Sequence, residues 1–397
     1  MEKLAVFGGK PVFEKKIGYG HQYIDDADIQ AVVDVLKSDF LTCGPKINEA
    51  EAKLCEITGA KHAVLISNGT AALHAACFAA GIGPGDEVIT TPITFAASAN
   101  CALYCGGKPV FADINPETYN IAPDSIEKCI TERTKAVVAV DFTGQAVEVQ
   151  RIREICDKHN LIFIEDAAHS LGTRFNGKPI GSLADMTEFS FHPVKTCTAG
   201  EGGAITTNDE ELYKKLLLFR THGITRVNEW MDKPSEGGWY YQQVDLGYNY
   251  RITDMQAALL SSQLDKLEHF ARRRKELVKR YDEAFREIPE IIVQREIPES
   301  DTVRHLYIIQ LDLEKLTCSR KEVYDALQAE GVGVNVHYIP AYFFPYYQNL
   351  GYKMGSCPNA ERLYERIISI PLFYSMTDED QEKVIVAVKK VIDYYRR

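Results

Sequence analysis

Short apolar runs alternate with segments of helical periodicity from about residue 60 to residue 210. Such runs, bounded by turn residues, are typical of buried strands. We expect strands at His62–Ser67, Glu87–Thr91, Pro109–Ala112, Ala136–Val140, Leu161–Ile164, Phe189–Phe191 and Gly203–Thr207. Helices are expected between several of them, at Ala71–Ala80, around Cys101 and Cys105, and at Val149–His159. Near-continuous apolar strands separated by helices favour a parallel sheet covered on both faces, so the predicted class is α/β.

The segments that flank this block have different patterns. Upstream, Asp25 and Asp26 can cap a helix over Ala27–Lys37, and Phe40–Pro45 is predicted to be a loop before the next helical stretch. Downstream, Gly223–Gly247 is polar, aromatic and rich in glycine. Long irregular segments of that kind within a compact domain are usually functional or mobile.

A long helical pattern from Thr253 to about Glu287 leads into a C-terminal unit of mixed strands and helices. Within that unit, strands are predicted at His305–Leu313 and Gly333–His337, and helices at Arg320–Glu330 and Asp378–Tyr395. A chain of 397 residues is long enough for two domains. We therefore expect an N-terminal arm at residues 1–20, a large domain at 21–260, and a linking helix with a smaller C-terminal domain at 261–397.

The charge balance and the lack of long apolar stretches disfavour several classes of function. Lys and Arg number 45 against 56 Asp and Glu, a formal net charge of −11. A chain of that sign does not attract nucleic acid or anionic membranes through its overall field. No stretch approaches the roughly 18 apolar residues of a membrane span, and Met1–Ala5 lacks the apolar core of a signal peptide. We expect a cytoplasmic protein that binds neither nucleic acid nor membrane.

The ten cysteines are scattered along the chain, and none stands in a C-x-x-C pair. Cys101 and Cys105 are the closest two, in an apolar segment that favours a helix face over a metal site. In a chain without an export signal, the cysteines are expected to be reduced and mostly buried thiols. No metal is predicted.

The segment Ser67–Thr70 joins a predicted strand to a predicted helix. Gly69 permits close approach of the backbone, Thr70 offers a hydroxyl, and the start of the helix supplies free N–H groups for an anion. An ordinary turn favours the same residue types, so this segment alone supports either interpretation. Gly81–Asp86 leads from a helix into a strand, the reverse of the dinucleotide-binding fingerprint, and is predicted to be a turn.

A carboxylate and an amine follow two of the later strands. Asp166 ends the run Leu161–Glu165 and should project from the carboxyl edge of the sheet, where open α/β sheets bind ligands. A helix N-cap is the alternative role for Asp166. Lys195 follows Ser190–Val194, and emergence from a buried strand would lower the pKa of its amine, as Schiff-base formation requires. Most lysines, by contrast, lie on the surface.

Two further residues of this block have less specific signals. Phe95 could stack on a flat ring or pack in the core, and His169, shortly after Asp166, is of a type that is usually packed rather than catalytic. The order is informative: phosphate turn, aromatic ring, aspartate and lysine follow one another in one α/β block. A carboxylate that keeps a pyridine nitrogen protonated lets the ring accept electrons. The order therefore indicates an enzyme that uses pyridoxal 5′-phosphate (PLP).

These motifs resemble those of the DegT/StrS family of PLP-dependent nucleotide-sugar aminotransferases. The resemblance extends from Tyr19 to Pro371. The segments that carry it are Ser67–Leu73, Thr91–Phe95, Glu165–His169, Ser190–Lys195 and Gly200–Gly203. It implies PLP-dependent transferase fold type I, the aspartate-aminotransferase fold, in which a large domain with a mostly parallel sheet carries a smaller C-terminal α/β domain.

The resemblance also implies roles for single residues. Lys195 resembles the Schiff-base lysine, Asp166 the partner of the pyridine nitrogen, and Phe95 the residue that stacks on the ring. The remaining cofactor contacts would be Gly69, Thr70 and Ser190, which form the phosphate cradle, together with His169 and Asn249. Asn249 resembles an asparagine that family members insert from the neighbouring subunit. We therefore expect a homodimer with shared active sites.

The substrate is indicated less directly. Sugar dehydratases of the family carry a histidine in place of the Schiff-base lysine, so Lys195 favours transamination. The segments Phe40–Thr42, Val140–Val149 and Val336–Pro340 resemble the branch that makes the 4-amino sugar precursor of pseudaminic acid. In that branch the nucleotide sugar would contact Tyr19, Asp39, Phe40, Leu41, Thr42, Gly69, Ser190, Asn249, Asn335, Val336, His337 and Tyr338. The family pattern is not followed at Asp141, Phe142, Thr143 and Pro193, and a histidine is common at the first of these.

The expected reaction moves an amino group from L-glutamate to C4 of a UDP-linked 4-keto-6-deoxy-N-acetylhexosamine, giving UDP-4-amino-4,6-dideoxy-N-acetyl-β-L-altrosamine. Lys195 would bind the cofactor and then act as general base. The alternative is transamination of another 4-keto or 3-keto nucleotide sugar, linked to UDP or dTDP. A regulator on a degenerate PLP fold is disfavoured because lysine, aspartate and phosphate turn are all present. Arg251 is a candidate for the donor carboxylates on charge alone.

Overall fold

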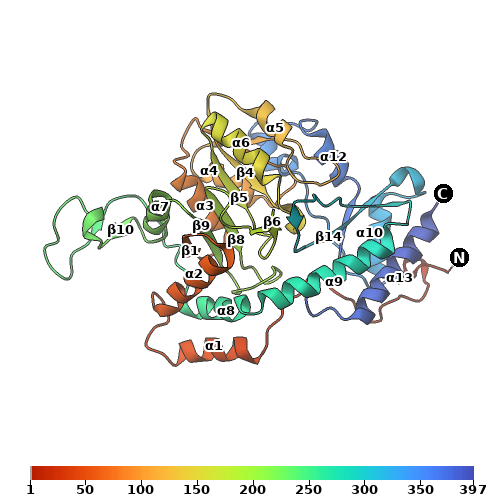
Figure 1. Ribbon diagram of the computed structural model, residues 1–397. Helices are drawn as coiled ribbons and strands as arrows, with labels where there is room; N and C mark the ends of the chain where they lie inside the picture. Colours follow the sequence, from red (N-terminus) through yellow and green to blue (C-terminus); the bar gives the residue numbers. More distant parts are fainter. Residues whose placement is uncertain (1) are drawn as a thin grey trace.

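The computed structural model describes residues 2–397 and contains a seven-stranded sheet at its centre (Figure 1). In order across the sheet, the strands are β1 (His62–Ile66), β9 (Gly203–Thr207), β8 (Met186–Ser190), β5 (Ile162–Asp166), β4 (Thr134–Val140), β2 (Glu87–Thr90) and β3 (Lys108–Phe111). Only β9 runs antiparallel to its neighbours. The predicted mostly parallel α/β sheet is therefore confirmed.

Helices cover both faces of this sheet, and successive residues of each strand point to opposite faces. One core contains the inner side chains of α3 (Gly69–Ala79), α4 (Ala97–Tyr104) and α7 (Glu210–Arg220). The other contains side chains from α2 (Pro45–Thr58), α5 (Pro123–Cys129), α6 (Val149–His159) and α8 (Asp254–Leu264). In β5, Ile164 belongs to the first core and Phe163 to the second. The helix predicted around Cys101 is α4, which ends just before Cys105.

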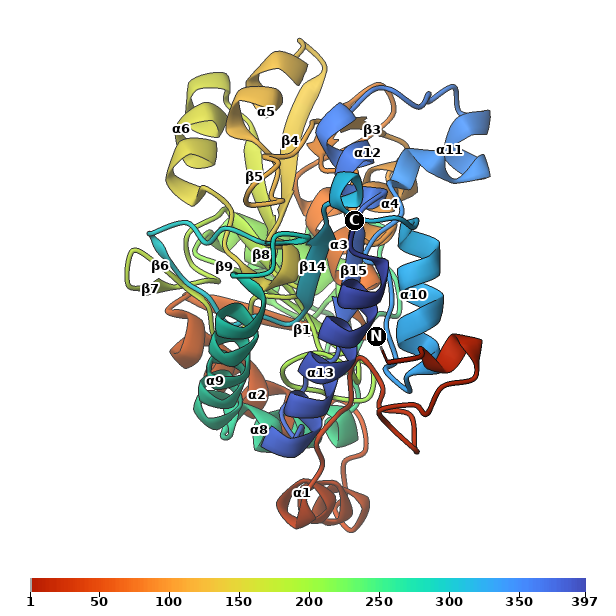
Figure 2. The same ribbon diagram turned by 90° about the vertical axis from the view of Figure 1, so that its right-hand side faces the viewer.

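The first helix, α1 (Asp26–Leu36), begins with a capping box formed by Asp25 and Asp28. It extends below the sheet and packs against α8 (Figures 1 and 2). The single long helix predicted from Thr253 to Glu287 is wrong. The chain forms α8 and then α9 (Leu267–Phe285), with a break at Asp265 and Lys266. The break lets α9 turn from the large sheet toward the C-terminal unit, whose core receives its later apolar side chains.

The C-terminal unit is built on an antiparallel sheet of β12 (Ile291–Val293), β14 (Tyr307–Leu311) and β15 (Ile367–Ile370). Its helices are α10 (Arg320–Ala329), α11 (Pro345–Asn349), α12 (Pro358–Tyr364) and α13 (Asp378–Tyr395). Leu4 and Phe13 are buried in the core of this unit. The N-terminal arm therefore packs on the C-terminal end of the chain, while the three predicted domain limits stay a prediction.

The strand predicted at Gly333–His337 is wrong. Only Asn335 pairs with a neighbour, through an isolated bridge to Ser369 at the edge of β15. The other backbone groups are used elsewhere: Gly333 N donates to Ile17 O at 2.7 Å, and Val336 N donates to the side chain of Asn335 at 2.8 Å. Hydrogen bonds to the N-terminal arm and to a local side chain thus replace the strand-to-strand backbone hydrogen bonds that the alternating sequence predicts.

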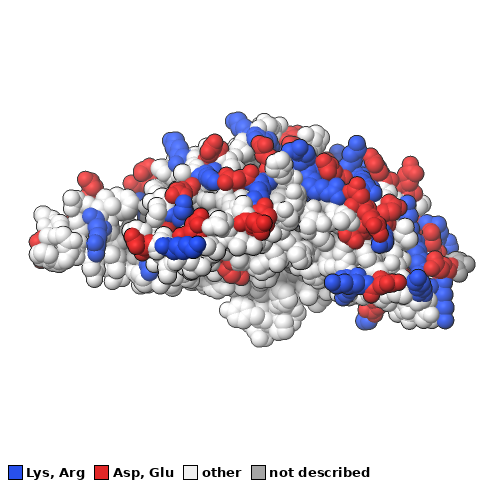
Figure 3. All heavy atoms as spheres, turned by 90° about the horizontal axis from the view of Figure 1, so that it is seen from below, with Lys and Arg blue, Asp and Glu red and all other residues white. Residues whose placement is uncertain are grey.

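The irregular segment at Gly223–Gly247 projects from the body of the molecule, at the left of Figure 1. It contains a short hairpin of β10 (Ile224–Thr225) and β11 (Gln242–Gln243) and one turn of 3-10 helix at Asn228–Trp230. A second small sheet, of β6 (Arg174–Phe175), β7 (Lys178–Pro179) and β13 (Ser300–Asp301), lies beside the large one. Basic and acidic side chains are interspersed on the face seen in Figure 3. Within residues 2–397, no helix is long and apolar enough to cross a bilayer.

Candidate active site

Asp166 is the last residue of β5, and its side chain is 3 % exposed. Ser98 Oγ donates a hydrogen bond to Oδ2 at 2.6 Å, and Ala168 N donates to Oδ1 at 3.2 Å. Both bonds use the carboxyl oxygens as acceptors. The position at the carboxyl end of a central strand is the one that the sequence predicts, and the two donors fix the direction of the carboxylate.

Lys195 lies on a turn after β8 rather than on the strand itself, which corrects the expectation that it emerges directly from a buried strand. Its N–H donates to His192 O at 2.9 Å, so the turn closes on itself. Desolvation lowers the pKa of the Lys195 amine to about 8, although the charges of Asp166 and Glu188 act in the opposite direction. A fraction of neutral amine is therefore present near neutral pH, as a nucleophile or base requires.

The predicted phosphate turn lies at the start of α3. Asn68 caps the helix by accepting a hydrogen bond from Ala71 N at 2.8 Å, which leaves Gly69 and Thr70 in the first turn. A Cβ on Gly69 would lie 3.2 Å from Ser190 Oγ and only 2.6 Å from Glu188 Oε1. Glycine is therefore needed for β8 to approach the helix start, and the approach brings the Ser190 hydroxyl beside free N–H groups.

Phe95 is 61 % exposed, an unusual state for a phenylalanine beside buried neighbours. Its ring centroid lies 6.3 Å from that of Tyr338, which comes from the C-terminal unit. The Phe95 side chain is therefore not packed in the core, which was the alternative role that the sequence left open. An exposed ring face at the site could stack on a planar cofactor.

Three histidines gather next to Lys195. His169 Nε2 lies 3.2 Å from Tyr338 Oη, and the ring centroids of His169 and His305 are 4.7 Å apart. His337 Nδ1 contacts Ser369 Oγ at 2.8 Å. Burial is the main cause that lowers the pKa of all three imidazoles, and the positive charge of Lys195 lowers each further. They are neutral at physiological pH and offer hydrogen bonds without added charge.

His305 and Glu188 are absent from the residues singled out in the sequence. His305 begins the predicted strand His305–Leu313, and the alternation of that strand by itself indicates no chemistry. Glu188 stands between Thr187 and Phe189, just before a strand that was predicted too late in the chain. Glu188 directly precedes the predicted strand Phe189–Phe191, which contains Ser190. An acidic residue at that position was the signal that could have identified it.

The predicted sugar-binding residues fall into two groups. Tyr19 and His337 lie together, with ring centroids 5.2 Å apart, and Asn335 Nδ2 is 3.4 Å from His337 Nε2. The loop Asp39–Thr42 instead contacts the start of α8: Leu41 O accepts a hydrogen bond from Asp254 N. Phe40 and Leu41 are exposed there. Within one chain, the described contacts therefore bring Tyr19, Asn335 and His337 together. They do not connect the loop Asp39–Thr42 to these residues.

Asn249 lies at the base of the projecting arm, where its backbone bridges to Thr221. Its neighbour Tyr250 accepts a hydrogen bond from Ser67 N at 2.9 Å, so this segment is anchored beside the phosphate turn. Asn249 is exposed, and no hydrogen bond from its side chain is present among residues 2–397. The amide is thus available to a molecule outside the chain.

Asp141, the position where the sequence departs from the family pattern, is fully buried. Ser170 Oγ donates to Oδ2 at 2.6 Å, and Val147 N donates to Oδ1 at 2.9 Å. Burial raises the pKa of Asp141 to about 7. With both oxygens bonded inside the protein, Asp141 holds the turn after β4 and does not offer its carboxyl to a sugar.

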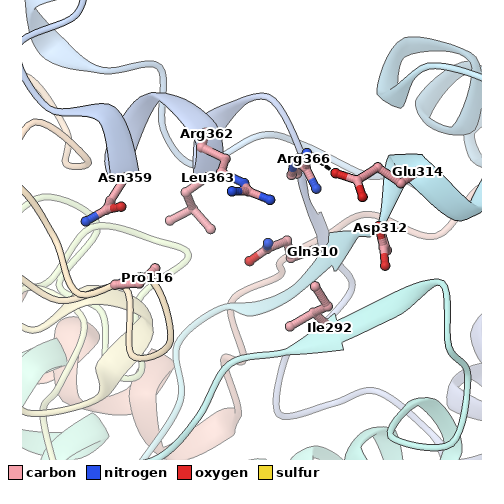
Figure 4. Close-up of a pocket in the computed structure, with 9 residues that line it drawn as sticks. All are labelled: Pro116, Ile292, Gln310, Asp312, Glu314, Asn359, Arg362, Leu363 and Arg366. Carbon is pink, nitrogen blue, oxygen red and sulfur yellow. Dashed lines mark ion pairs between the residues drawn. The ribbon is translucent and has the colours of Figure 1, made fainter.

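A separate cavity of about 330 Å³ lies in the C-terminal unit (Figure 4). Its lining includes Arg362 and Arg366, but also Asp312 and Glu314, so its charges are balanced. Arg366 already contacts Glu314 at 3.6 Å. None of the predicted cofactor-binding or sugar-binding residues lines this cavity, and the chemistry described above lies elsewhere.

The residues at the carboxyl edge of the sheet fit PLP. A partly buried amine, a carboxylate held ionised, an exposed aromatic ring and an anion-binding helix start are the groups that the aldehyde, pyridine nitrogen, ring face and phosphate of that cofactor require. Because Gly69 has no side chain, a phosphate can approach the backbone closely at this turn. Among residues 2–397, no group of three or more His, Cys, Asp and Glu side chains is placed to hold a metal ion.

Comparison with known proteins identifies the same chemistry. Residues 22–389 match the family model described as the DegT/DnrJ/EryC1/StrS aminotransferase family. The spore coat polysaccharide biosynthesis protein SpsC of Bacillus subtilis is 42 % identical over 376 residues, which cover 94 % of this chain and 96 % of that protein. A UDP-4-amino-4,6-dideoxy-N-acetyl-beta-L-altrosamine transaminase of Campylobacter jejuni is 39 % identical over 373 residues, covering 93 % and 95 %.

Solved structures agree with these relatives. Helicobacter pylori PseC, an aminotransferase involved in the biosynthesis of pseudoaminic acid, superposes with a TM-score of 0.89 at 34 % identity, covering 96 % of this chain and 100 % of that one. The PLP form of a Streptococcus pneumoniae protein described as a sugar aminotransferase has the same TM-score at 32 % identity, covering 96 % and 99 %. The chain therefore belongs to the DegT/DnrJ/EryC1/StrS family and is a PLP-dependent aminotransferase of fold type I that acts on nucleotide sugars.

Proposed function

We propose that this enzyme transfers the amino group of L-glutamate to C4 of a UDP-linked 4-keto-6-deoxy-N-acetylhexosamine, giving UDP-4-amino-4,6-dideoxy-N-acetyl-β-L-altrosamine for pseudaminic acid. The observation that carries the reaction is the Lys195 amine in the electrostatic field of the Asp166 carboxylate, at one edge of the sheet. Similarity to the Campylobacter transaminase and to Helicobacter PseC supports the choice of sugar.

PLP, when bound, supplies a ring that accepts electrons from the carbon that loses its proton. In this proposal Asp166 holds the ring nitrogen in its protonated form, and Phe95 covers one face of the ring. Gly69, Thr70 and Ser190 hold the phosphate at the start of α3. The neutral side chain of His169, in contact with Tyr338 Oη, would be a further cofactor contact.

Lys195 has two roles in the proposal. Its neutral amine would hold the cofactor by its aldehyde, and the same amine would act as the base that moves the α-proton of the donor. Tyr19 and His337, together with the loop Asp39–Thr42, would orient the sugar so that its 4-keto carbon faces the transferred nitrogen. The contact between the first two rings supports a sugar pocket built by the N-terminal arm and the C-terminal unit.

A second candidate substrate has its own support. The chain is 42 % identical to SpsC, a protein of spore coat polysaccharide biosynthesis, and this identity is slightly higher than that to the altrosamine transaminase. A different 4-keto or 3-keto sugar, on UDP or dTDP, would use the same cofactor site. The two candidates differ in the sugar, and in some cases in the nucleotide, but not in the cofactor chemistry.

A panel of keto sugars distinguishes these substrates. With L-glutamate as donor, we expect release of 2-oxoglutarate with the UDP-linked 4-keto-6-deoxy-N-acetylhexosamine, and slower release with dTDP-linked or 3-keto sugars. Coupled detection of 2-oxoglutarate gives kcat/KM for each sugar. Turnover confined to dTDP sugars would exclude the proposed substrate while leaving the PLP chemistry intact.

We further propose a homodimer in which Asn249 and the arm at Gly223–Gly247 complete the active site of the neighbouring subunit. The exposed Asn249 amide supports this proposal, as do the exposed apolar side chains of the arm, among them Trp239 and Leu246. An exposed set of large apolar residues on a projecting segment is typical of a protein interface. A cytoplasmic location stays a prediction from the sequence.

Subunit mixing tests the shared site. If Asn249 acts across the interface, Lys195→Ala and Asn249→Ala dimers should regain activity after unfolding and refolding together, because each mixed dimer has one intact site. Random pairing gives about a quarter of the wild-type activity. Lys195→Ala mixed with Asp166→Ala is the matched control, since both residues come from one chain and each mixed dimer keeps two damaged sites. Equal activity in the two mixtures would contradict the proposal.

The pKa of Lys195 predicts how cofactor binding depends on pH. The neutral amine attacks the aldehyde, and its fraction rises as pH passes through a pKa of about 8. The rate at which the cofactor-free protein binds PLP should therefore increase with pH and level off above about pH 8. Stopped-flow absorbance measures this rate. An unperturbed lysine would level off only above about pH 10.4, and a midpoint there would show that burial does not lower the pKa.

A further inference from the structure

A buried glutamate lies beside the proposed partner of the ring nitrogen. Glu188 is 1 % exposed and sits on β8, in register with Asp166 on the parallel strand β5. Residues paired in this way point to the same face of a sheet, which here is the face covered by α3. Neither oxygen of Glu188 has a hydrogen-bond partner among the described residues. Its Oε1 also lies at Gly69, in the phosphate turn.

Two adjacent buried carboxyls do not both ionise, because each negative charge raises the pKa of the other. The hydrogen bonds decide which one holds the proton. Asp166 accepts from Ser98 Oγ and from Ala168 N, whereas Glu188 has no donor. The charge therefore resides on Asp166 and the proton on Glu188.

The other groups around Glu188 agree with this assignment. Burial, together with the charge and hydrogen-bonding capacity of Asp166, raises the pKa of Glu188 well above its usual range. Cys101 on α4 acts in the same direction, and Lys195 opposes it. A charged Glu188 would also lie beside the turn that receives the phosphate, and two anions so close would repel each other.

We propose that Glu188 is a positioning residue for Asp166: its neutral carboxyl donates a hydrogen bond to the Asp166 carboxylate and keeps that carboxylate ionised and aimed at the ring nitrogen of the cofactor. The proton stays on Glu188 throughout. This inference rests on the proposed role of Asp166. It assigns a function to a buried acid that has no other hydrogen-bond partner within residues 2–397.

The effect of removing the donor has a definite direction. Without the bond from Glu188, the Asp166 carboxylate is a stronger base and takes a larger share of the proton on the ring nitrogen. The ring then accepts electrons less well. A hydrogen bond to a charged group corresponds to a roughly tenfold to hundredfold effect. We expect the rate of the half-reaction with L-glutamate to fall by that factor in Glu188→Leu. In Glu188→Gln the rate should fall less than about twofold, because the amide keeps a hydrogen-bond donor.

Infrared spectroscopy of the cofactor-free protein tests the proton directly. At neutral pH, wild-type protein should show the carbonyl band of a neutral carboxylic acid that Glu188→Gln lacks. Asp166→Asn should shift the same band, because the acceptor of the Glu188 hydrogen changes from a carboxylate to an amide. Glu165→Gln is the matched control: Glu165 is equally buried, but it lies one residue before Asp166 on β5 and points to the opposite face.

The visible absorbance of the PLP-loaded protein gives a second measurement. Weaker protonation of the ring makes the nitrogen that joins Lys195 to the cofactor more basic, so the pH midpoint of the absorbance change should rise by about one unit in Glu188→Leu. Glu188→Gln and Glu165→Gln should titrate close to wild type.

Three results would overturn the proposal. They are an infrared band that Glu188→Gln retains in full, a band that Asp166→Asn leaves in place, and a Glu188→Leu midpoint equal to that of wild type. The first two do not depend on the leucine variant, so a failure of that variant to fold leaves the test intact. Failure of the wild-type protein to bind PLP would instead contradict the proposed function, while the infrared result would still report the proton on Glu188.

Discussion

Replacing Lys195 by alanine is expected to abolish transamination. In the proposed mechanism, the variant loses the amine that binds the cofactor aldehyde and the base that moves the α-proton of the donor. Loss of general-base catalysis alone costs on the order of 10²–10⁴ in rate, and the loss of the covalent link adds to it. We expect kcat below the detection limit of a coupled 2-oxoglutarate assay. The visible absorbance of the cofactor joined to a lysine should also be absent.

A surface lysine serves as the control for Lys195. Lys178 is exposed on β7, and Lys178→Ala should keep both the absorbance and the activity. Exogenous methylamine offers a further check, because a small amine can enter the space left by the side chain and restore part of the proton transfer. If Lys195→Ala turned over at a rate within tenfold of wild type, another group would have to be the base, and Lys195 would lose its assigned role.

The strands that carry the site could be predicted from the sequence because their buried runs are nearly continuous. Asp166 ends such a run, whereas Ser190 lies within the predicted strand Phe189–Phe191; the structure places both at strand ends on the same edge of the sheet. The phosphate turn could be predicted for the same reason, since Gly69 stands between a strand and a helix with clear periodicity. Local pattern was sufficient wherever a strand end alone decides the position of a side chain.

Other features depend on contacts between distant parts of the chain. Gly333 donates its backbone hydrogen bond to Ile17 in the N-terminal arm, so the alternation around it does not produce a strand. His305 reaches the site from the C-terminal unit, where its neighbours in sequence are ordinary core residues. No pattern within a short window contains that information.

Glu188 shows a third limit of sequence patterns. Carboxylates are rarely buried without a partner, so a glutamate next to an apolar run predicts the end of a strand rather than its interior. In the structure β8 extends back past Glu188 to Met186. The burial of Glu188 is explained by Asp166, which lies more than 20 residues away in sequence but next to Glu188 in the sheet.

Changing the charge of Asp166 should have the second-largest effect. Asp166→Asn keeps the size of the side chain and its bond from Ser98, but it removes the negative charge that is proposed to hold the proton on the ring nitrogen. Loss of one preorganised electrostatic partner costs on the order of 10²–10³ in kcat. We expect that loss for both half-reactions, since each requires the ring to accept electrons from a carbon. KM for L-glutamate should change less than kcat, because the substitution acts on the charge of the ring rather than on a group proposed to bind the donor carboxylates.

A graded variant separates the charge of Asp166 from its orientation. Ser98 Oγ is 2.6 Å from Asp166 Oδ2, and Ser98→Ala removes this bond while leaving the charge. The expected fall in kcat is about tenfold, the effect of one hydrogen bond to a charged group. Single-turnover absorbance changes with L-glutamate measure the first half-reaction in both variants. If Asp166→Asn were no slower than Ser98→Ala, the carboxylate charge would contribute nothing beyond its hydrogen bond, and the ring nitrogen would need a different partner.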